Sequence, residues 1–493
     1  MKNRKPSDPL SWFYQAAIHG VTPQMHVEAI GKDPGVGDVN TVRYWSQCPH
    51  NQQHSANFLP WHRAYTHHFE KILRMHVEDD DFALPYWSYS HWDSPDWDKN
   101  RKDRVKFPKA FGVEKVDGVE NHLFHAERNK FLCSYDHPYT TELPLSELTA
   151  SAVDAQKALE SPIFFGDTES TGIGGAVMDD DKSTRGLLEQ SPHDQIHRVV
   201  GGQVAGTDGN GNVTFALGGM AVPPTAGFDP IFPVHHSNID RLWAKWSRMP
   251  GKSWGALPNA AWFDEKPWYF FDTDGKVVNL PRRAYFDYRA LGIRFADEDL
   301  TVEPLKLPVV VASTDSNYAA FAAVRTQPKL SFEISVGAHA SAQAPTALAI
   351  TSPSSALAGS IALLSDTVAA QTAPGGVMVE LKGITFHGSL TTGYDVYLVE
   401  TGRDAQTLKR DDPAFLGSLS LFNHIAGHDH SDKLNQTFFA KRALGAAPTK
   451  SLKDLSVVIV PYELATPPKT TGIPLPPPGM VMVESIAVTV AAP

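Results

Sequence analysis

The arrangement of the histidines constrains this chain more than any other feature of its sequence. The 493 residues include 21 histidines, and they occur in clusters. In "PHDQIHRVVGG" (192–202), His193 and His197 stand four residues apart, and residues at i and i+4 share one face of a helix. Two imidazoles on one face can point at a single ion. An isolated pair of this kind is more often a surface pair, so further histidines are needed to support a metal site.

A third element occurs forty residues later. The segment "FDPIFPVHHSNIDRLWAKW" places His235 and His236 among apolar residues with helical spacing. Three neutral imidazoles in an apolar setting suit copper or zinc, because magnesium and calcium sites are built from oxygen ligands. The pattern therefore favours a buried metal site over a surface pair. The spacing alone does not choose between copper and zinc.

A second set of histidines lies nearer the N-terminus. The segment "WFYQAAIHG" contributes His19, and "CPHNQQHSANFLPWHRAY" contributes His50, His54 and His62. His62 opens a segment whose apolar residues recur at helical spacing. Two sets of three histidines on neighbouring helices would hold two metal ions close together. A pair of copper ions can supply two electrons to O2, which a single Cu(I) cannot.

The chain divides into two regions of different character. Residues 1–305 are rich in histidine, tryptophan and helical patterns, whereas residues 306–493 contain short β-type runs such as "YDVYLVE", bounded by Gly and Asp. Residues 341–375 are rich in Ala, Ser, Thr and Pro, which is typical of an inserted loop or linker. We therefore expect a mainly α catalytic domain, a helix bundle, followed by an all-β, sandwich-like C-terminal domain.

Composition argues against several classes of protein. A net charge of −11 argues against nucleic acid as a partner. No run of 18 apolar residues occurs, so no membrane span is expected. Two cysteines, Cys48 and Cys133, exclude a disulfide scaffold and suit a reducing compartment. The first residues show no secretory signal, so we expect a cytoplasmic location. The sequence does not indicate an oligomeric state.

Two of these segments resemble the copper signatures of the tyrosinase / polyphenol oxidase family of type 3 dicopper proteins. They are "FLPWHRAY…FE" and "FDPIF…HHSNIDRLW", and "ALPYWSY" (83–89) is similar to a further family segment. The "YFDY" run (285–288) resembles the tyrosine motif that closes the catalytic domain in plant polyphenol oxidases. The runs "GSLSLFNHIAGH" and "SLKDLSVVIVPYE" resemble the β domain that follows it there. The resemblance thus extends over the whole chain.

This resemblance implies a copper-dependent oxidoreductase that uses two copper ions and O2. The implied reaction is the oxidation of o-diphenols to o-quinones, with ortho-hydroxylation of monophenols left open. The β domain would lie over or beside the copper site, where it could shield the site and make the enzyme latent. Two alternatives remain, a haemocyanin-like O2 carrier and an o-aminophenol oxidase.

The resemblance also assigns candidate ligands by position. The second copper would take His193, His197 and His236, and the first would take His19, His62 and one further histidine. In the second set, His235 would orient its neighbour.

The further histidine of the first site is either His54 or His50. The family places it one residue further from "FLPWH" than His54 stands, and His50 is three residues too far out. His50 follows Cys48 in the pattern of fungal and mollusc relatives, where a thioether joins the two residues. Both histidines therefore stay candidates for the third ligand. Cys48 is either part of a thioether or a buried free thiol.

Three further residues are candidates for a catalytic role by the same resemblance. Glu189 stands four residues before His193, where plant relatives hold a water with a glutamate, and Asp194 replaces the Asn of many monophenol-hydroxylating members. Together they could position a water that takes the proton of a phenol. Arg198 would lie at the mouth of the site and attract acidic phenols, or it would be a surface charge.

Overall fold

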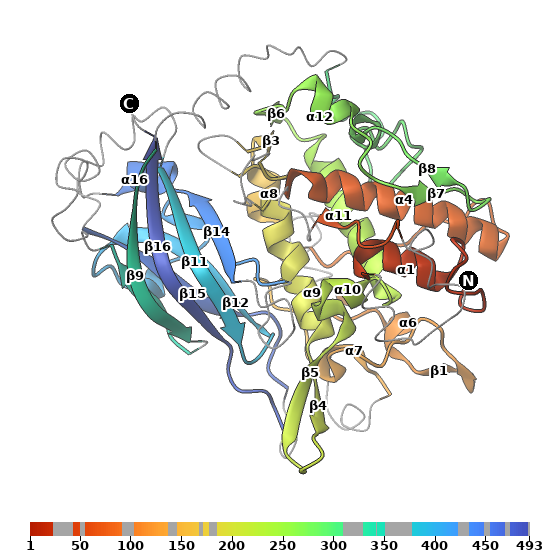
Figure 1. Ribbon diagram of the computed structural model, residues 1–493, viewed down its shortest axis with the longest axis horizontal. Helices are drawn as coiled ribbons and strands as arrows, with labels where there is room; N and C mark the ends of the chain where they lie inside the picture. The colour runs from red at the N-terminus through yellow and green to blue at the C-terminus, as the bar shows by residue number, and fades with distance from the viewer. Residues whose placement is uncertain are drawn as a thin grey trace.

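The protein is described by a computed structural model. The structure describes residues 1–22, 43–49, 55–90, 103–136, 145–166, 171–176, 185–308, 329–341, 343–350, 377–422, 433–447, 454–468 and 474–491. Helices gather in the described residues up to 308, the helical part, and long strands in those from 329 onward, the β part (Figure 1). Within the described residues, no helix has both the length and the apolar character needed to span a bilayer.

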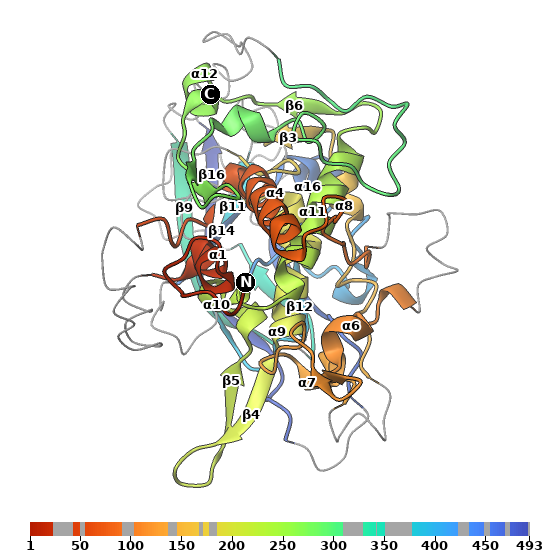
Figure 2. The same cartoon turned by 90° about the vertical axis from the view of Figure 1, so that its right-hand side faces the viewer.

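Four helices carry the histidines or pack beside them. They are α1 (Trp12–Gly20), α4 (Phe58–Val77), α9 (Asp194–Gly201) and α11 (Ile231–Trp246). Helix α4 confirms the helical pattern predicted after His62 and buries most of its first three turns, from Phe58 to Phe69. Helices α4 and α11 lie side by side (Figure 1, Figure 2).

Helix α9 ends at Gly201, the first of two consecutive glycines. Gly202 follows its last residue with φ of +58°, a left-handed conformation that favours glycine. A Cβ there would lie 2.6 Å from the Cβ of Asn129, so a larger residue would also be crowded. Before α9, a π-helical turn at Glu189–His193 is interrupted by extended backbone at Ser191.

Shorter elements complete the helical part. The helices are α6 (Lys109–Gly112), α7 (Lys130–Cys133), α8 (Gln156–Glu160), α10 (Pro223–Ala226) and α12 (Ala260–Asp264), with 3₁₀ turns at Ser55–Asn57, Gly219–Ala221 and Arg282–Tyr285. The strand pairs are β1 (Lys115–Val116) with β2 (Val119–Glu120), β3 (Ile163–Phe165) with β6 (Ser253–Gly255), β4 (Gln203–Thr207) with β5 (Val213–Leu217), and β7 (Phe270–Phe271) with β8 (Val277–Val278). The β4–β5 hairpin extends away from the helices (Figure 1).

The β part contains two antiparallel four-stranded sheets. One sheet has the order β10 (Thr346–Ala349), β15 (Leu455–Glu463), β12 (Thr392–Glu400), β13 (Phe415–Ser418), and the other the order β14 (Leu434–Phe439), β11 (Val377–His387), β16 (Met480–Ala491), β9 (Lys329–Ser341). A 3₁₀ turn at Ala405–Thr407 and helix α16 (Lys441–Ala446) connect strands. One cluster of buried apolar side chains includes residues of both sheets, such as Val379, Leu381, Val396 and Ile459.

The segment predicted as an insert or linker differs from that prediction at one end. Residues 346–349 form strand β10, which pairs with β15 from Thr346 opposite Ile459 to Ala349 opposite Ser456. Alternating small and apolar residues satisfy strand pairing here despite the low complexity of the sequence. Residues 351–376 lie outside the described part of the chain.

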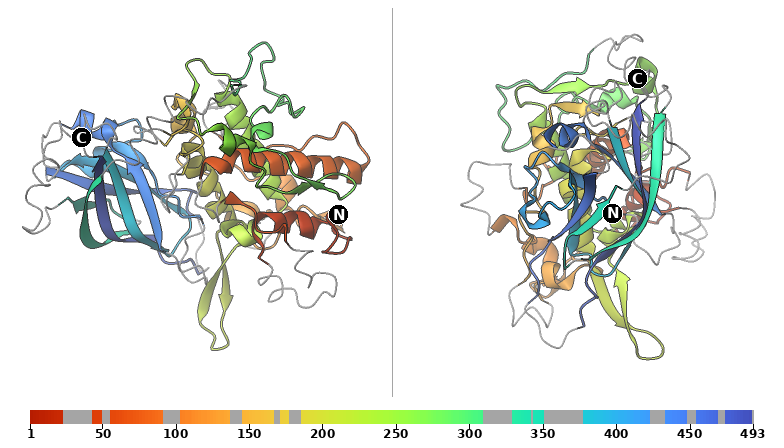
Figure 3. Two further views of the ribbon diagram at one scale, coloured as in Figure 1. Left: turned by 45° about the horizontal axis from the view of Figure 1, so that its top comes forward. Right: turned by 90° about the vertical axis from the view of Figure 1, so that its left-hand side faces the viewer.

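The β part packs against the helical part (Figure 3). Arg410 donates to both oxygens of Asp395 in β12 and also reaches Asp154 of the helical part, at 3.3 Å. Leu148 and Ala465 form an isolated β bridge between the two parts. Phe422, Leu464 and Ala465 of the β part belong to the main apolar cluster of the helical part. The contact is therefore a continuous core with polar pairs at its edge.

A buried ion pair joins α4 to α11. Arg63 Nε lies 2.6 Å from Asp240 Oδ1, and their side chains are 1% and 6% exposed. The guanidinium also lies over the ring of Trp243, 3.4 Å from its centroid, and donates to the carbonyl of Tyr285 at 3.1 Å. Each charge is therefore compensated without water, and the pair fixes the spacing of the two helices next to His62.

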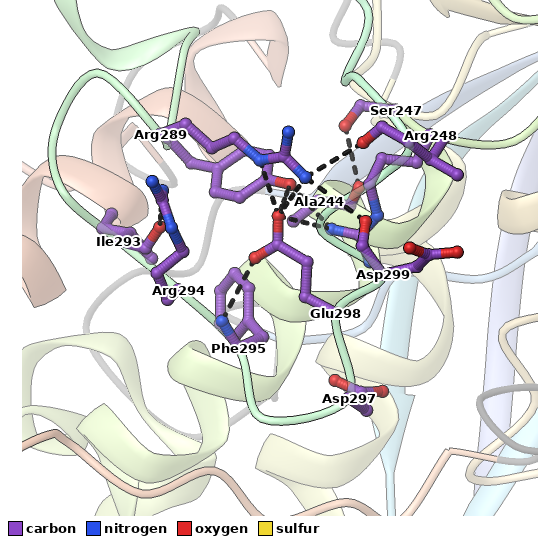
Figure 4. A network of polar contacts seen from close by, with 12 residues as sticks. Ala244, Ser247, Arg248, Arg289, Ile293, Arg294, Phe295, Asp297, Glu298 and Asp299 are labelled. Carbon is purple, nitrogen blue, oxygen red and sulfur yellow. Dashed lines mark hydrogen bonds and ion pairs between the residues drawn. The ribbon is translucent and has the colours of Figure 1, made fainter.

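A second polar network closes the C-terminal end of α11. Glu298 Oε1 accepts from Tyr288 at 2.6 Å and from Arg289 Nε at 2.7 Å, and it lies 3.4 Å from Arg248 Nη1 (Figure 4). Tyr288 is the last residue of the "YFDY" run. The network thus ties residues 288–298 to the end of the helix that carries His235 and His236.

Removing one member of the buried ion pair should destabilise the protein strongly. Asp240→Ala leaves Arg63 charged and buried, which costs about 3–5 kcal/mol of unfolding free energy. The matched control is Asp264→Ala, because Asp264 pairs with Arg283 at 2.6 Å but is 61% exposed. The control should lose no more than about 1 kcal/mol. Urea unfolding followed by tryptophan fluorescence measures both, and equal losses would contradict the role given to Asp240.

Candidate metal centre

Four histidines form the larger of two clusters. His193, His197, His235 and His236 are buried, and one ring nitrogen of each lies within 4.8 Å of the others. His193 ends the π-helical turn, His197 lies in α9, and the other two lie in α11. His197 Nε2 and His236 Nε2 are 3.2 Å apart. The Nδ1 of His197 donates to the carbonyl of Met220 at 2.9 Å, so its Nε2 carries the lone pair that a metal needs.

The smaller cluster contains His19, Cys48 and His62, again with donor atoms within 4.8 Å of one another. His62 Nδ1 donates to the carbonyl of Phe58 at 2.9 Å, and His19 Nδ1 to that of Pro223 at 2.8 Å. Both Nε2 atoms therefore carry lone pairs. Cys48 is anchored beside them, because its backbone N–H donates to the carbonyl of His19 at 3.0 Å.

A glycine brings α10 close enough for the bond at His19. A Cβ on Gly20 would lie 2.6 Å from the carbonyl oxygen of Pro223, so any larger residue there would push α10 away. The carbonyl of Pro223 is the acceptor for His19 Nδ1. The order "IHG" at the end of α1 therefore sets both the ligand and the close approach that orients it.

The two clusters are neighbours. The rings of His62 and His236 are parallel within 5°, with centroids 4.0 Å apart. Burial lowers the pKa of His19 to about 4 and that of His197 to about 3, and it lowers the pKa of His62, His235 and His236 well below the usual value. Neutral imidazoles are the form that binds metals. The donors thus fit two metal ions held side by side, with copper or zinc favoured by nitrogen and sulfur ligands.

Five of the histidines predicted as metal ligands come together in these clusters. They are His19, His62, His193, His197 and His236. His50 and His54 lie outside the described residues, so the choice between them stays a prediction. His235 has its Nδ1 2.8 Å from the hydroxyl of Tyr89, and its Nε2 has no hydrogen-bond partner within the described part of the chain. Tyr89 was not predicted as a site residue, although "ALPYWSY" contains it.

Asp194 is the hydrogen-bond partner of a candidate ligand. Its Oδ1 accepts from His193 Nδ1 at 2.8 Å, so a carboxylate orients this imidazole where backbone carbonyls orient His19, His62 and His197. The prediction that Asp194 positions a water did not include this contact.

Glu189 and Asp194 are buried and share one cation. Arg185 Nη1 lies 3.3 Å from an oxygen of each. Burial raises the pKa of both carboxyl groups, and the charge of Arg185 opposes the rise. Arg185 was not identified from the sequence, where nothing distinguishes it from a surface arginine.

Arg198 is not a surface charge. It is buried, donates to the carbonyl of Thr392 at 2.7 Å and lies over the ring of Phe386, 4.8 Å from its centroid. Thr392 and Phe386 belong to the β part, so the position expected at the mouth of the site is covered. Burial lowers the pKa of Arg198 to about 10, and the side chain is still a cation at neutral pH.

Phe422 of the β part lies directly against the larger cluster. Its ring stacks on His197, with centroids 4.2 Å apart, and meets His193 edge-on at 5.9 Å. Nearby, the backbone N–H of Ser418 donates to Gln190 Oε1 at 3.3 Å. The sequence indicated a β run at "GSLSLFNHI" but gave no sign of what this aromatic residue contacts.

Comparison with known proteins adds independent findings. Residues 9–249 match the family described as the common central domain of tyrosinase. Tyrosinase HcTyr1 of Hahella sp. (strain CCB-MM4) is 30% identical over 293 residues, covering 57% of this chain and 55% of that protein. The chloroplastic polyphenol oxidase of Spinacia oleracea is 28% identical over 308 residues, 61% of this chain and 44% of that protein. The chain thus matches about half the length of these relatives.

Solved structures are similar over both parts of the chain. Latent aurone synthase (polyphenol oxidase) from its natural source superposes with a TM-score of 0.52 at 18% identity, covering 100% of this chain and 85% of that one. Latent apple tyrosinase gives a TM-score of 0.52 at 20% identity, covering 99% and 92%. These similarities concern the fold. Proteins of the tyrosinase family use a dicopper centre, and the two donor clusters fit one.

The contact between Asp194 and His193 predicts a specific loss of metal affinity. Asp194→Ala should weaken binding at the larger cluster by about 10–100-fold, the usual effect of removing the partner of a ligating histidine. Asp194→Asn should lose less, because its side-chain oxygen still accepts a hydrogen bond. Chelator competition with copper measures both affinities. Asp208→Ala, in the exposed β4–β5 turn, is the control and should bind as the unaltered protein does. Unchanged affinity in Asp194→Ala would contradict the assignment.

Proposed function

Because this chain belongs to the tyrosinase family through residues 9–249, we propose that it is a copper-dependent oxidoreductase that oxidises o-diphenols to o-quinones with O2. The observation that carries the proposal is the pair of buried donor clusters joined by the stacked rings of His62 and His236. Two copper ions held there would supply the two electrons that reduction of O2 to the peroxide level requires. Ortho-hydroxylation of monophenols is the second proposed activity.

We assign the ligands from the donors described above. The first copper takes His19, His62 and either His54 or His50, and the second takes His193, His197 and His236. This assignment is supported by the hydrogen bonds at Nδ1 of His19, His62 and His197, which direct each Nε2 to the metal. His235 is hydrogen-bonded to Tyr89 and so orients the part of α11 that carries its neighbour His236.

The proposed handling of the substrate proton involves Glu189, Asp194 and Arg185. A phenol of pKa about 10 has to lose its proton to bind copper as the phenolate. One oxygen of each carboxyl group lies 3.3 Å from Arg185 Nη1, and Asp194 also accepts from His193 Nδ1, which supports a role in holding a water that accepts that proton. Diphenols lose a proton more readily and depend less on this water.

We propose that the β part keeps the protein latent. Phe422 occupies the face of His197 that a phenol ring would approach, and Thr392 covers Arg198. Release of the β part would uncover both residues, and Arg198 would then attract acidic phenols. The solved relatives include proteins titled as latent. We also infer that residues 306–493 form a domain of their own in which the two sheets pack as a sandwich, supported by the cluster they share.

Phe422 gives the direct test of latency. A stacked aromatic pair contributes about 0.5–1.5 kcal/mol, so Phe422→Ala should raise the open population, and with it catechol turnover, by about 2- to 12-fold. The matched control is Phe415→Ala, because Phe415 packs on Tyr397 within the β part, with centroids 5.4 Å apart. Its turnover should not rise.

Two measurements on the copper-loaded chain test the proposed function as a whole. Metal analysis of the copper-loaded chain should give two copper ions per chain, and catechol oxidation should consume O2. Zinc alone in the active form, or one copper per chain, would contradict the proposal. Reversible O2 uptake without catechol turnover in any variant would favour an O2 carrier instead.

The carboxylates predict a change in selectivity. Asp194→Asn and Glu189→Gln should alter the rate ratio between tyramine and dopamine more than the dopamine rate alone, with Glu189→Gln the more severe. Loss of a proton-transfer group reduces the dependent step by up to about 10²–10⁴-fold. Initial rates at equal copper loading measure this ratio. Parallel changes for both substrates would show that these residues only shape or stabilise the pocket.

A further inference from the structure

The two donor clusters are chemically unlike. The larger contains only imidazoles, whereas the smaller contains the thiol of Cys48 together with two imidazoles. Cys48 is 0% exposed, and its sulfur lies 3.6 Å from His62 Nε2. His19 at the end of α1, Cys48 in the segment before α4 and His62 in α4 thus bring three buried donors close together.

One separation in the smaller cluster matches that of two ligands on a shared metal ion, and all three donor atoms lie within 4.8 Å of one another. Metal–nitrogen bonds of about 2.0 Å and metal–sulfur bonds of about 2.3 Å, at a tetrahedral angle, separate nitrogen from sulfur by about 3.5 Å. The observed separation of Cys48 Sγ from His62 Nε2 is 3.6 Å. Because the Nδ1 atoms of His19 and His62 donate to backbone carbonyls, both Nε2 atoms present lone pairs toward the same place as the sulfur.

The backbone holds Cys48 in this position. Its N–H donates to the carbonyl of His19 at 3.0 Å, and the neighbouring N–H of Gln47 donates to the carbonyl of Ile18 at 2.9 Å. These two bonds fasten residues 47–48 to the C-terminal turn of α1, where the last carbonyls of a helix lack partners. The sulfur is thus placed beside His19 by main-chain contacts that do not depend on a metal.

We propose that Cys48 is a donor to the first copper, through its sulfur, together with His19 and His62. The inference rests on the proposed dicopper function and adds to it that the two sites differ in softness. Binding replaces the thiol proton by the metal, so one proton leaves for each Cu(I) bound. A thiolate and two imidazoles favour Cu(I), so the first site should take up Cu(I) more tightly than the all-imidazole site.

Cys133 provides a matched control within the chain. It is 1% exposed, and its sulfur lies 3.8 Å from the carbonyl of Val200 and in neither donor cluster. Cys48→Ser and Cys133→Ser therefore make the same chemical change at two buried thiols. Only the first should affect copper.

The experiment loads the full chain with Cu(I) under anaerobic conditions and records X-ray absorption at the copper edge. We expect sulfur in the copper shell of the unaltered protein and of Cys133→Ser, and none in Cys48→Ser. Chelator competition should show at least a tenfold loss of Cu(I) affinity at one of two sites in Cys48→Ser. The spectrum of the unaltered protein is decisive by itself should Cys48→Ser fail to fold.

Three results would overturn the proposal. An all-nitrogen copper shell in the unaltered protein would do so, and so would equal Cu(I) affinities in both serine variants. A tryptic peptide containing Cys48 whose mass is two hydrogens lower than its sequence requires would show that the sulfur is a thioether. In each case, continued catechol oxidation with two coppers would leave the proposed function intact. An unaltered protein that binds no copper would contradict the proposed function as well.

Discussion

The candidate site depends on the packing of α4 against α11. This contact brings His62 and His236 into a parallel stack at 4.0 Å and so makes two donor clusters into neighbours. The buried pair of Arg63 and Asp240 fixes the same contact, because both charges are shielded from water and Trp243 covers the guanidinium. An ion pair of this kind adds little net stability over apolar packing, but it penalises any shift that separates its members. The spacing between the helices is therefore set by an electrostatic constraint adjacent to the ligands.

Orientation of the imidazoles is a separate matter from their position. His19, His62 and His197 are each fixed by a carbonyl that accepts at Nδ1. The acceptors for His19 and His197 belong to other elements, whereas the acceptor for His62 is Phe58, one turn earlier in α4. His193 differs because a carboxylate, Asp194, takes the place of the carbonyl. A carboxylate increases the basicity of the imidazole and links it to Arg185 and Glu189. The two clusters thus differ in their donors, because only the smaller contains a thiol, that of Cys48. They also differ in the groups that orient those donors.

The β part contributes to the same site. Phe422 stacks on His197, and the carbonyl of Thr392 accepts from Arg198, the residue after His197. These contacts remove an aromatic ring and a buried cation from water together, so neither is easily released alone. Under the proposed latency, access to the histidines depends on how firmly the two parts of the chain hold each other.

The sequence by itself determined the chemistry of the site. Histidines at helical spacing among apolar residues, in two sets, predict buried nitrogen donors, because spacing along a helix is a local property. The helix after His62, the end of α9 at Gly202 and the β character of the C-terminal region were likewise readable, since each follows from neighbouring residues. Only the tertiary structure decided which groups meet across long separations. The acceptor of His193 Nδ1, the covering of Arg198, the stack of Phe422 on His197 and the approach of Cys48 to His62 join residues by packing. Thr392 and Phe422 come from the β part, far away in sequence from Arg198 and His197. Cys48 and Asp194 are nearer to their partners in sequence, but the direction in which their side chains point depends on the fold and not on a local pattern.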